Sequence, residues 1–283
     1  MMEPQGSRLS RQADRLSDAR GPSSVVGSIG PDATRPPSAV SQATSTPHWR
    51  LLLTTSTSPF VDLRNTSYGV KQQRSPLARQ RIYEAVLSHW LRNYPQLPIT
   101  VVESGWQQNG LGRGSRLLWV SRATAKTSPT ASARVRALRL DPAASCSRQE
   151  IGCHEADAIY RAVGAMRRSH EQSLKPSTRV LKVTGRYAIT SNVDEVLRGC
   201  PLDWDVALQN SSWHDSIHGT QVLGFRAELS DSLFGWSRRG GECQECHVHR
   251  WVAMHPQVVV CHLPRLSVRR VREGSTGSLR TYI

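Results

Sequence analysis

The chain has 283 residues, 38% of them hydrophobic, and a formal net charge of +15. This length allows one large domain or two small ones, and the hydrophobic fraction is sufficient for a core. No apolar run is long enough to span a bilayer or to act as an N-terminal signal peptide, so we expect neither a membrane protein nor an exported one.

Residues 1–47 are rich in Ser, Pro, Arg and Gly and contain few large apolar side chains. Such a segment cannot bury enough surface to offset the entropy of ordering, so we predict a disordered tail. Its arginines are typical of an organelle transit peptide, although Asp14 and Asp18 lie among them, so organelle targeting stays open. The folded domain is expected over residues 48–283.

The folded part begins with a strand, a helix and a second strand. Leu51–Thr55 is a short apolar run that predicts a buried strand. Ser75-Pro76 is a helix start, and apolar residues follow at helical spacing as far as Tyr94. Ile99–Glu103 then predicts another strand. A strand, helix and strand in this order indicate two parallel strands joined by a crossover helix.

Residues 111–140 carry a concentration of positive charge without any acidic residue. The basic residues are Arg113, Arg116, Arg122, Lys126, Arg134, Arg136 and Arg139. A run of this kind predicts a solvated loop or insertion, and a nucleic-acid-binding surface is the alternative.

The later elements continue the alternation of helices and strands. The expected ranges are a helix at His154–Arg168, strands at Arg179–Thr184, Val222–Phe225 and Gln257–Cys261, and an interrupted helical region at Leu233–Met254. The predicted fold class is α/β, with a mainly parallel sheet flanked by helices.

The end of the Arg179–Thr184 strand predicts a binding site. Side chains alternate along a strand, so Lys182 and Thr184 point to the same face. Gly185 allows a sharp turn, and Arg186 then offers a planar fork that suits phosphate or carboxylate. Glu103 ends another predicted strand. Ligands of such sheets bind at the carboxyl ends of the strands, so we expect these residues near one site. A buried strand with a cationic end is the alternative.

Two pairs of acidic residues are candidates for chemistry. Asp203 and Asp205 flank one residue, a spacing that can hold a divalent metal and through it a diphosphate. A solvated loop is the alternative. Glu155 and Asp157 stand near the start of a predicted helix, where the helix dipole alone accounts for negative charge.

The cysteines give a weaker signal. Cys243-Gln-Glu-Cys246-His247 has the spacing of a c-type haem attachment site, and with Cys261-His262 it could supply zinc ligands. A helix with inward-facing cysteines is the alternative. Without a signal peptide, the six cysteines are expected to be free thiols in a reducing compartment, which predicts a cytoplasmic protein.

Several segments in chain order carry a family resemblance. They are Leu-Leu-Leu-Thr-Thr at 51–55, Arg79-Gln80 with Tyr83, Val102-Glu103-Ser104-Gly105, Gly152-x-x-Glu155-Ala-Asp157-Ala-Ile159 and Lys182-x-Thr-Gly-Arg-Tyr187. Over residues 50–230 the chain resembles a group of glycosyltransferase-like proteins found in capsule-synthesis gene sets and in algae. It departs from their pattern at Ser104, where Asn is usual, and at Cys153-His154.

The resemblance implies a Rossmann-like, GT-A-like domain that transfers a sugar from a nucleotide-diphosphate donor to a glycan or another hydroxyl acceptor. In this interpretation Lys182, Thr184 and Arg186 hold the donor diphosphate. Asp203 and Asp205 hold Mn²⁺ or Mg²⁺ if a metal is used. The general base is Glu103, Glu155 or Asp157. The alternatives are an Arg-rich nucleic-acid-binding protein without enzymatic activity and a zinc-stabilised interaction module.

Overall fold

The computed structural model describes nine ranges of the chain, namely 49–56, 76–104, 117–141, 145–146, 151–169, 174–209, 219–238, 244–272 and 279–282. The chain divides into two units, Met1–Thr44 and Ser45–Ile283, and every described residue belongs to the second. The predicted disordered tail over residues 1–47 therefore lies outside the described residues.

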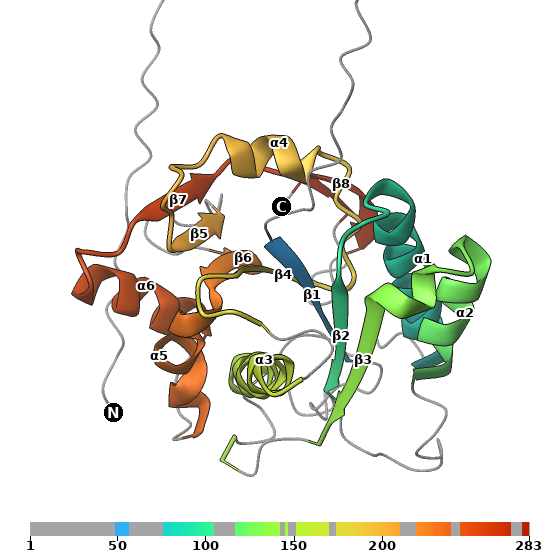
Figure 1. The fold of residues 1–283 in the computed structure, drawn as a ribbon, viewed down its shortest axis with the longest axis horizontal. Helices are drawn as coiled ribbons and strands as arrows, with labels where there is room; N and C mark the ends of the chain where they lie inside the picture. Colours follow the sequence, from blue (N-terminus) through green and yellow to red (C-terminus); the bar gives the residue numbers. More distant parts are fainter. Residues whose placement is uncertain are drawn as a thin grey trace, which may run out of the picture. The chain divides into compact units, whose positions relative to one another are not determined.

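Helices and strands alternate along most of this unit (Figure 1). The α-helices are α1 (Pro76–Asn93), α2 (Leu118–Thr127), α3 (Ile151–Arg167), α4 (Val193–Arg198), α5 (Ser230–Phe234) and α6 (Gln244–Met254). The 3-10 helices are η4 (Ala131–Arg134), η5 (Ala227–Leu229) and η6 (Gly235–Arg238). The strands are β1 (Trp49–Thr55), β2 (Ile99–Ser104), β3 (Val135–Leu140), β4 (Arg179–Thr184), β5 (Val206–Gln209), β6 (Gly219–Arg226), β7 (Val260–Leu263), β8 (Ser267–Arg272) and β9 (Leu279–Tyr282).

Seven of the strands form one sheet in the order β3-β2-β1-β4-β6-β5-β7. All neighbouring pairs are parallel except those of β6, which runs antiparallel to both β4 and β5. β8 and β9 form a separate antiparallel pair. The predicted α/β fold with a mainly parallel sheet flanked by helices is confirmed.

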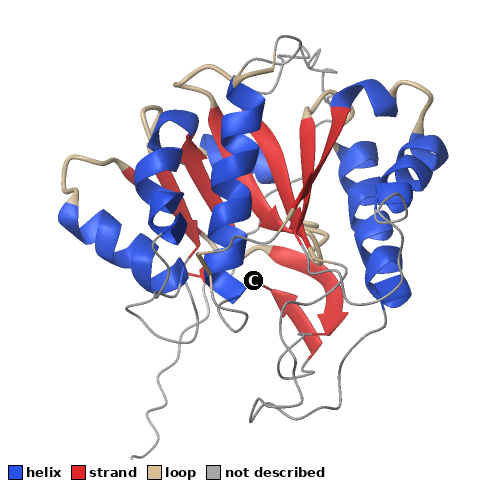
Figure 2. Cartoon of the chain, turned by 90° about the horizontal axis from the view of Figure 1, so that it is seen from below, coloured by secondary structure: helices blue, strands red, loops and turns tan. Residues whose placement is uncertain are grey.

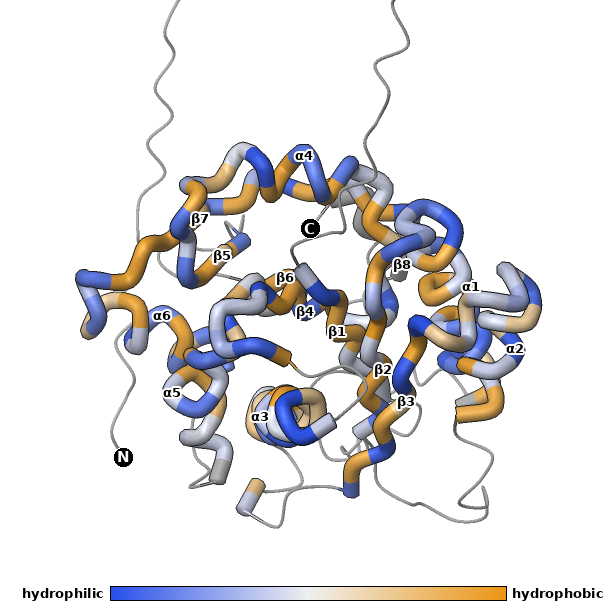
Figure 3. Tube along the Cα trace, viewed as in Figure 1, coloured by the Kyte–Doolittle hydropathy of each residue, from blue (hydrophilic) through white to orange (hydrophobic). Residues whose placement is uncertain are grey.

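Hydrophobic cores lie on both faces of the sheet, because successive side chains of each strand point in opposite directions. Leu51 and Leu53 of β1 pack on the face that α1, α2 and α4 cover, whereas Leu52 packs on the face of α3, α5 and α6. Figure 2 shows helices on either side of the strands, and Figure 3 shows the hydrophobic residues that recur along β1 and β2. Because β1, β2 and β4 are parallel neighbours in this sheet, their carboxyl ends lie side by side. These strand ends form one edge of the sheet, across the direction of the strands.

The prediction of a solvated loop over residues 111–140 is wrong for the part that the structure describes. Residues 117–140 contain α2, η4 and β3, and β3 is an outer strand of the main sheet. Trp119 and Ala123 of α2 are completely buried on the α1 face of the sheet. The apolar residues of α2 form a narrow stripe. Basic residues surround them in the sequence, so the helical spacing of the apolar residues is difficult to recognise.

The prediction of free thiols is also wrong. Cys146 is bonded to Cys153 at the start of α3, and Cys200 is bonded to Cys261, which joins the end of α4 to β7. Cys246 is disulfide-bonded as well. A bonded sulfur is not the thiolate that a metal requires, so the zinc and haem interpretations of Cys246 are not supported.

Disulfides persist in oxidising compartments, so the bridges remove the thiol argument for a reducing one. Among the described residues, no helix combines the length and the apolar character that crossing a membrane requires.

Candidate functional site

The carboxyl ends of β1, β2 and β4 meet at one edge of the sheet. The parallel register places Thr54 opposite Thr184 and Thr55 opposite Glu103. The chain turns immediately after β4, where the N–H of Gly185 donates to the carbonyl oxygen of Thr54 at 2.7 Å. These residues therefore form one continuous polar edge, as the sequence predicts for Glu103 and Thr184.

On the α3 face of this edge, three side chains converge on one carboxylate oxygen of Glu155. Oε1 of Glu155 lies 2.8 Å from Nζ of Lys182 and accepts hydrogen bonds from Thr54 at 2.6 Å and from Thr184 at 3.4 Å. Lys182 also donates to the hydroxyl of Thr184 at 3.1 Å. The other oxygen, Oε2, has no hydrogen-bond partner among the described residues, and the Glu155 side chain keeps 23% of its surface exposed. Oε1 of Glu155 is thus fixed by its partners, and Oε2 is available to a ligand.

The two charged side chains of this group, Glu155 and Lys182, lie in different environments. Burial by itself raises the pKa of Glu155, but the Lys182 ammonium and the hydrogen bond from Thr54 together lower that pKa below its usual value. The Lys182 side chain exposes no surface. Lys182 is thus buried beside Glu155 in this structure, and its role toward a diphosphate stays a prediction.

On the α1 face, Glu103 lies in a closed position. Its carboxylate accepts a hydrogen bond from Thr55 at 2.7 Å, and Glu103 is completely buried. Nearby, the hydroxyl of Tyr83 donates to the carbonyl oxygen of Ser56 at 2.9 Å. Burial raises the pKa of Tyr83, and the charge of Glu103 raises it further. Glu103 is thus buried and hydrogen-bonded within the fold, on the opposite face of the sheet from Glu155.

Arg186 is brought to the edge by a turn that requires glycine. A Cβ on Gly185 would lie 2.5 Å from Cγ2 of Thr55, closer than side chains approach one another. The guanidinium of Arg186 lies over the ring of Tyr187, with 5.1 Å between its central carbon and the ring centroid. Its Nε atom is buried and has no hydrogen-bond partner in the part of the chain that the structure describes. An unused donor on a permanent cation is suited to an anionic ligand.

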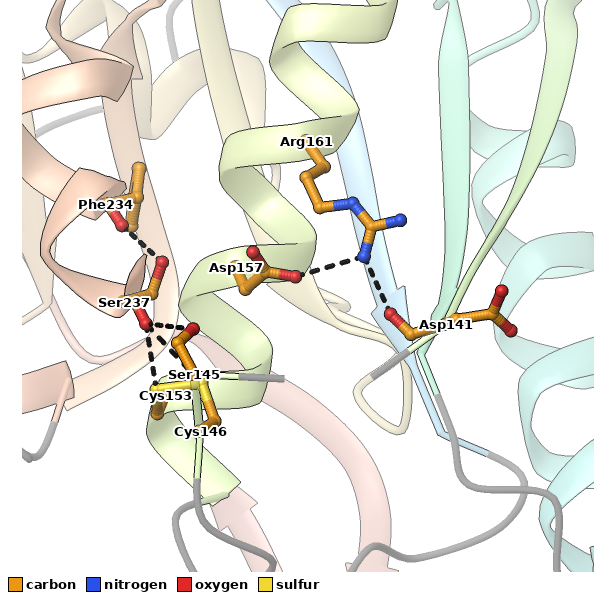
Figure 4. A network of polar contacts seen from close by, with 8 residues as sticks. All are labelled: Asp141, Ser145, Cys146, Cys153, Asp157, Arg161, Phe234 and Ser237. Atoms are coloured by element: carbon orange, nitrogen blue, oxygen red, sulfur yellow. Dashed lines mark hydrogen bonds and ion pairs between the residues drawn. A yellow bond between two sulfur atoms is a disulfide. The ribbon is translucent and has the colours of Figure 1, made fainter. Parts of the chain in front are cut away.

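The structure does not bring Asp157 to this group. Asp157 accepts a hydrogen bond from Arg161, one turn further along α3, at 3.3 Å, and Arg161 also donates to the carbonyl oxygen of Asp141 at 2.7 Å (Figure 4). The carboxylate of Asp157 is thus tied to an arginine of its own helix, and it shares no contact with Glu155.

Asp203 and Asp205 lie at the opposite edge of the sheet. Asp205 precedes β5 and pairs with Nε of Arg226 at 3.1 Å, while Arg226 is the register partner of Arg179 at the start of β4. The six residues of β4 separate this position from Thr184 by roughly 16 Å. Asp205 also accepts a hydrogen bond from the N–H of Val259 at 2.9 Å, and Asp203 is exposed.

The residues at the strand ends suit a divalent cation poorly. Within the described ranges, no group of three or more His, Cys, Asp and Glu residues is placed to hold a metal ion. Oε1 of Glu155 is occupied by an ammonium group and two hydroxyls, and Glu103 is closed off on the other face of the sheet.

Sequence reasoning from the motifs missed several members of the site. Thr54 and Thr55 end β1 and point to opposite faces of the sheet. Thr54 donates a hydrogen bond to Glu155, and Thr55 donates one to Glu103. Arg79 of α1 donates from Nη1 to the carbonyl oxygen of Ser56 at 3.3 Å. The signal available in the sequence was the pair of adjacent threonines at the end of an apolar strand. Side chains alternate along a strand, so the two hydroxyls point to opposite faces of the sheet.

Comparisons with known proteins give only distant likenesses. No family model matches the chain, and no curated protein matches it. A nucleotide-diphospho-sugar transferase from Desulfovibrio desulfuricans, so described only provisionally, has 13% identity and a TM-score of 0.43, over 77% of this chain and 80% of that one.

The galactosyltransferase LgtC, solved with donor and acceptor sugar analogues, has 10% identity and a TM-score of 0.39, over 75% of this chain and 72% of that one. A nucleoside-diphosphate-sugar pyrophosphorylase from Vibrio cholerae has 7% identity and a TM-score of 0.43, over 76% and 91% of the two chains. The function proposed below rests on the residues of the site and not on these likenesses.

Proposed function

We propose that the chain is a glycosyltransferase with a GT-A-like domain, which moves a sugar from a nucleotide-diphosphate donor to a hydroxyl acceptor. The observation that carries the proposal is the carboxylate of Glu155, held by one oxygen at the carboxyl edge of a mainly parallel sheet that also carries Arg186. Ligands of such sheets bind at this edge, and the reaction needs both an anion-binding group and a hydroxyl-binding group there.

Arg186 neutralises the donor diphosphate in this proposal. A nucleoside diphosphate leaves with its electron pair when the bond between the anomeric carbon and the phosphate oxygen breaks. The charge that develops on the leaving group is stabilised by a fixed cation, which is the main catalytic contribution. The guanidinium of Arg186 is already oriented by the ring of Tyr187 and has a donor to spare.

Glu155 acts on the acceptor. As the acceptor oxygen bonds to the anomeric carbon, its proton moves to Oε2 of Glu155, the oxygen without a partner. Lys182 and Thr184 take part indirectly, because they hold Oε1 and so fix the direction of Oε2. Of the three carboxylates considered from the sequence, Glu155 is the one that combines position and exposure; Glu103 and Asp157 are engaged elsewhere.

The nucleic-acid-binding alternative is not favoured by the basic residues of α2 and β3. Arg122 and Lys126 both pair with Glu84. Arg134 donates to the carbonyl oxygens of Tyr94 and Leu97. These side chains make contacts within the protein. A polyanion would have to compete for them with Glu84 and with the two carbonyl oxygens.

The experiment is a panel of nucleotide sugars with the full chain, in which released nucleoside diphosphate and sugar transfer are measured. We expect one donor to be turned over, and we expect Glu155→Gln to lower kcat by about a hundredfold or more, as for loss of a general base. Asp231→Asn is the matched control, because Asp231 is a carboxylate that pairs with Arg167 on the surface.

Absence of binding for every nucleoside diphosphate would refute the proposal. Loss of activity in Asp157→Asn, with Glu155→Gln fully active, would show that the wrong carboxylate of α3 has been chosen.

A further inference from the structure

We propose that Arg79 and Arg186 together form an anion clamp that binds the donor diphosphate in place of a divalent cation. The inference rests on the proposed function and deepens it, because it assigns the chemistry of donor recognition to two arginines from different elements. Arg79 comes from the first turns of α1, and Arg186 follows β4.

Both arginines lie against the last residues of β1. Nη1 of Arg79 donates to the carbonyl oxygen of Ser56, and the hydroxyl of Tyr83 donates to the same oxygen. Gly185, next to Arg186, donates its N–H to Thr54, and a Cβ on it would lie 3.5 Å from Cδ1 of Tyr83. Tyr83 therefore lies close to the surroundings of both arginines, and the charges of both act on its hydroxyl.

Each of the two guanidinium groups has a donor that no described residue uses. The Nε atoms of Arg79 and Arg186 are both buried and have no hydrogen-bond partner in the described ranges. A buried donor without a partner costs free energy, so such atoms are uncommon in a folded protein. Two of them, on cations that both act on Tyr83 near the strand ends where ligands bind, point to an anion that accepts from both.

The balance of charge at the strand ends favours an anion over a metal ion. Among the described residues placed above at the ends of β1, β2 and β4, the cations Arg79, Lys182 and Arg186 outnumber the carboxylates Glu103 and Glu155. Each carboxylate has an oxygen that already accepts from a neighbouring side chain. A divalent cation would add to an excess of positive charge, whereas a diphosphate would neutralise it.

The acidic pair that the sequence suggests as a metal site lies elsewhere. Asp203 and Asp205 are at the amino end of β5, and Asp205 is engaged by Arg226 and by the N–H of Val259. A metal held there could not reach a phosphate bound beside Arg186, because the length of β4 lies between. The sequence suggests a metal ion held by Asp203 and Asp205, but the positive charge gathers at the opposite ends of the strands. An anion bound by the two arginines is consistent with both observations.

The test is isothermal titration of the full chain with inorganic pyrophosphate and with a panel of nucleoside diphosphates, each in excess EDTA and then with Mn²⁺. We expect binding of similar affinity under both conditions. Arg79→Gln and Arg186→Gln should each weaken pyrophosphate binding roughly tenfold to a hundredfold, as expected for loss of a charged hydrogen-bond partner. Arg92→Gln, an exposed arginine in the last turn of the same helix, is the matched control and should leave binding unchanged.

The outcomes separate this inference from the proposed function. Nucleoside diphosphates that bind only with Mn²⁺ would overturn the clamp and leave the glycosyltransferase intact. Pyrophosphate binding that is equal in wild type and in both arginine variants, with circular dichroism showing that the variants are folded, would overturn it as well. Pyrophosphate binding that depends on both arginines, without binding of any nucleoside diphosphate, would support the clamp and refute the proposed function.

Discussion

Nζ of Lys182 lies 2.8 Å from Oε1 of Glu155, and the Lys182 side chain exposes no surface to solvent. The ammonium group of Lys182 also donates to the hydroxyl of Thr184, and a buried charge needs such partners to offset its loss of hydration. The pair therefore joins α3 to β4 at the edge of the sheet, and removing either side chain takes a charged partner away from the other.

Lys182→Met should destabilise the protein by about 3–5 kcal/mol, because it leaves the carboxylate of Glu155 without its buried partner. Urea unfolding monitored by tryptophan fluorescence measures the change. Arg161→Ala is the control, since Arg161 pairs with Asp157 in a half-exposed position and its loss should cost about 1 kcal/mol or less. Equal effects of the two substitutions would contradict the assignment of Lys182 as a buried partner.

Acid should weaken the contribution of Glu155 to stability. Despite burial, Lys182 and Thr54 lower the pKa of Glu155 in the folded state, so the folded protein binds this proton less readily than the unfolded chain. The stabilisation is therefore fully present above the unfolded value, about 4.3, and is lost as the pH falls through the folded pKa. The unfolding free energies of wild type and Glu155→Gln should converge below about pH 4. A difference that grows on acidification would show that Glu155 is protonated in the folded protein.

Gly185→Ala should be strongly destabilising, by about 2 kcal/mol or more, because the added methyl group meets the side chain of Thr55 and the carbonyl oxygen of Thr54. Gly235→Ala is a matched control, since a Cβ there would have no atom within 4 Å and the backbone φ is −64°. Melting temperatures by differential scanning calorimetry distinguish the two. A tolerated Gly185→Ala would mean that the turn after β4 is not as tight as described.

The two mapped disulfides should differ in their effect on stability. Cys200–Cys261 closes a separation of 61 residues, whereas Cys146–Cys153 closes one of seven. On the chain-entropy model, replacing both cysteines of a pair by serine should cost about 4 kcal/mol for the long loop and about 2 kcal/mol for the short one. Chemical unfolding of the two double variants checks the order, and a larger loss for the short loop would contradict it.

The elements with strong periodicity were predictable from the sequence. The bounds of β4 are those expected, and α1 and α3 differ from their predicted ranges by a few residues at their ends. β5 was missed because it has only four residues and follows a polar turn. That omission also explains the interpretation of Asp203 and Asp205. Once β5 is known to follow them, the pair lies at the amino end of a strand, the wrong end for a ligand in this kind of sheet.

The composition of the site was predictable only in part. Lys182, Thr184 and Arg186 were predicted from one motif, but the partner of Lys182 comes from α3, and nothing in the local sequence joins it to Glu155. Arg79 was quoted only within the resemblance. The direction of β6 was not predictable, because the order of strands in a sheet depends on long-range pairing and not on the pattern of a single strand.

The bond between Cys200 and Cys261 has a practical consequence for all of these measurements. Protein made in a reducing bacterial cytosol would lack the covalent link between α4 and β7 and would be a poor sample of the native protein. Secretion to the periplasm, or a host strain with an oxidising interior, is the appropriate route of production. A peptide map under non-reducing conditions would verify the material before any assay is interpreted.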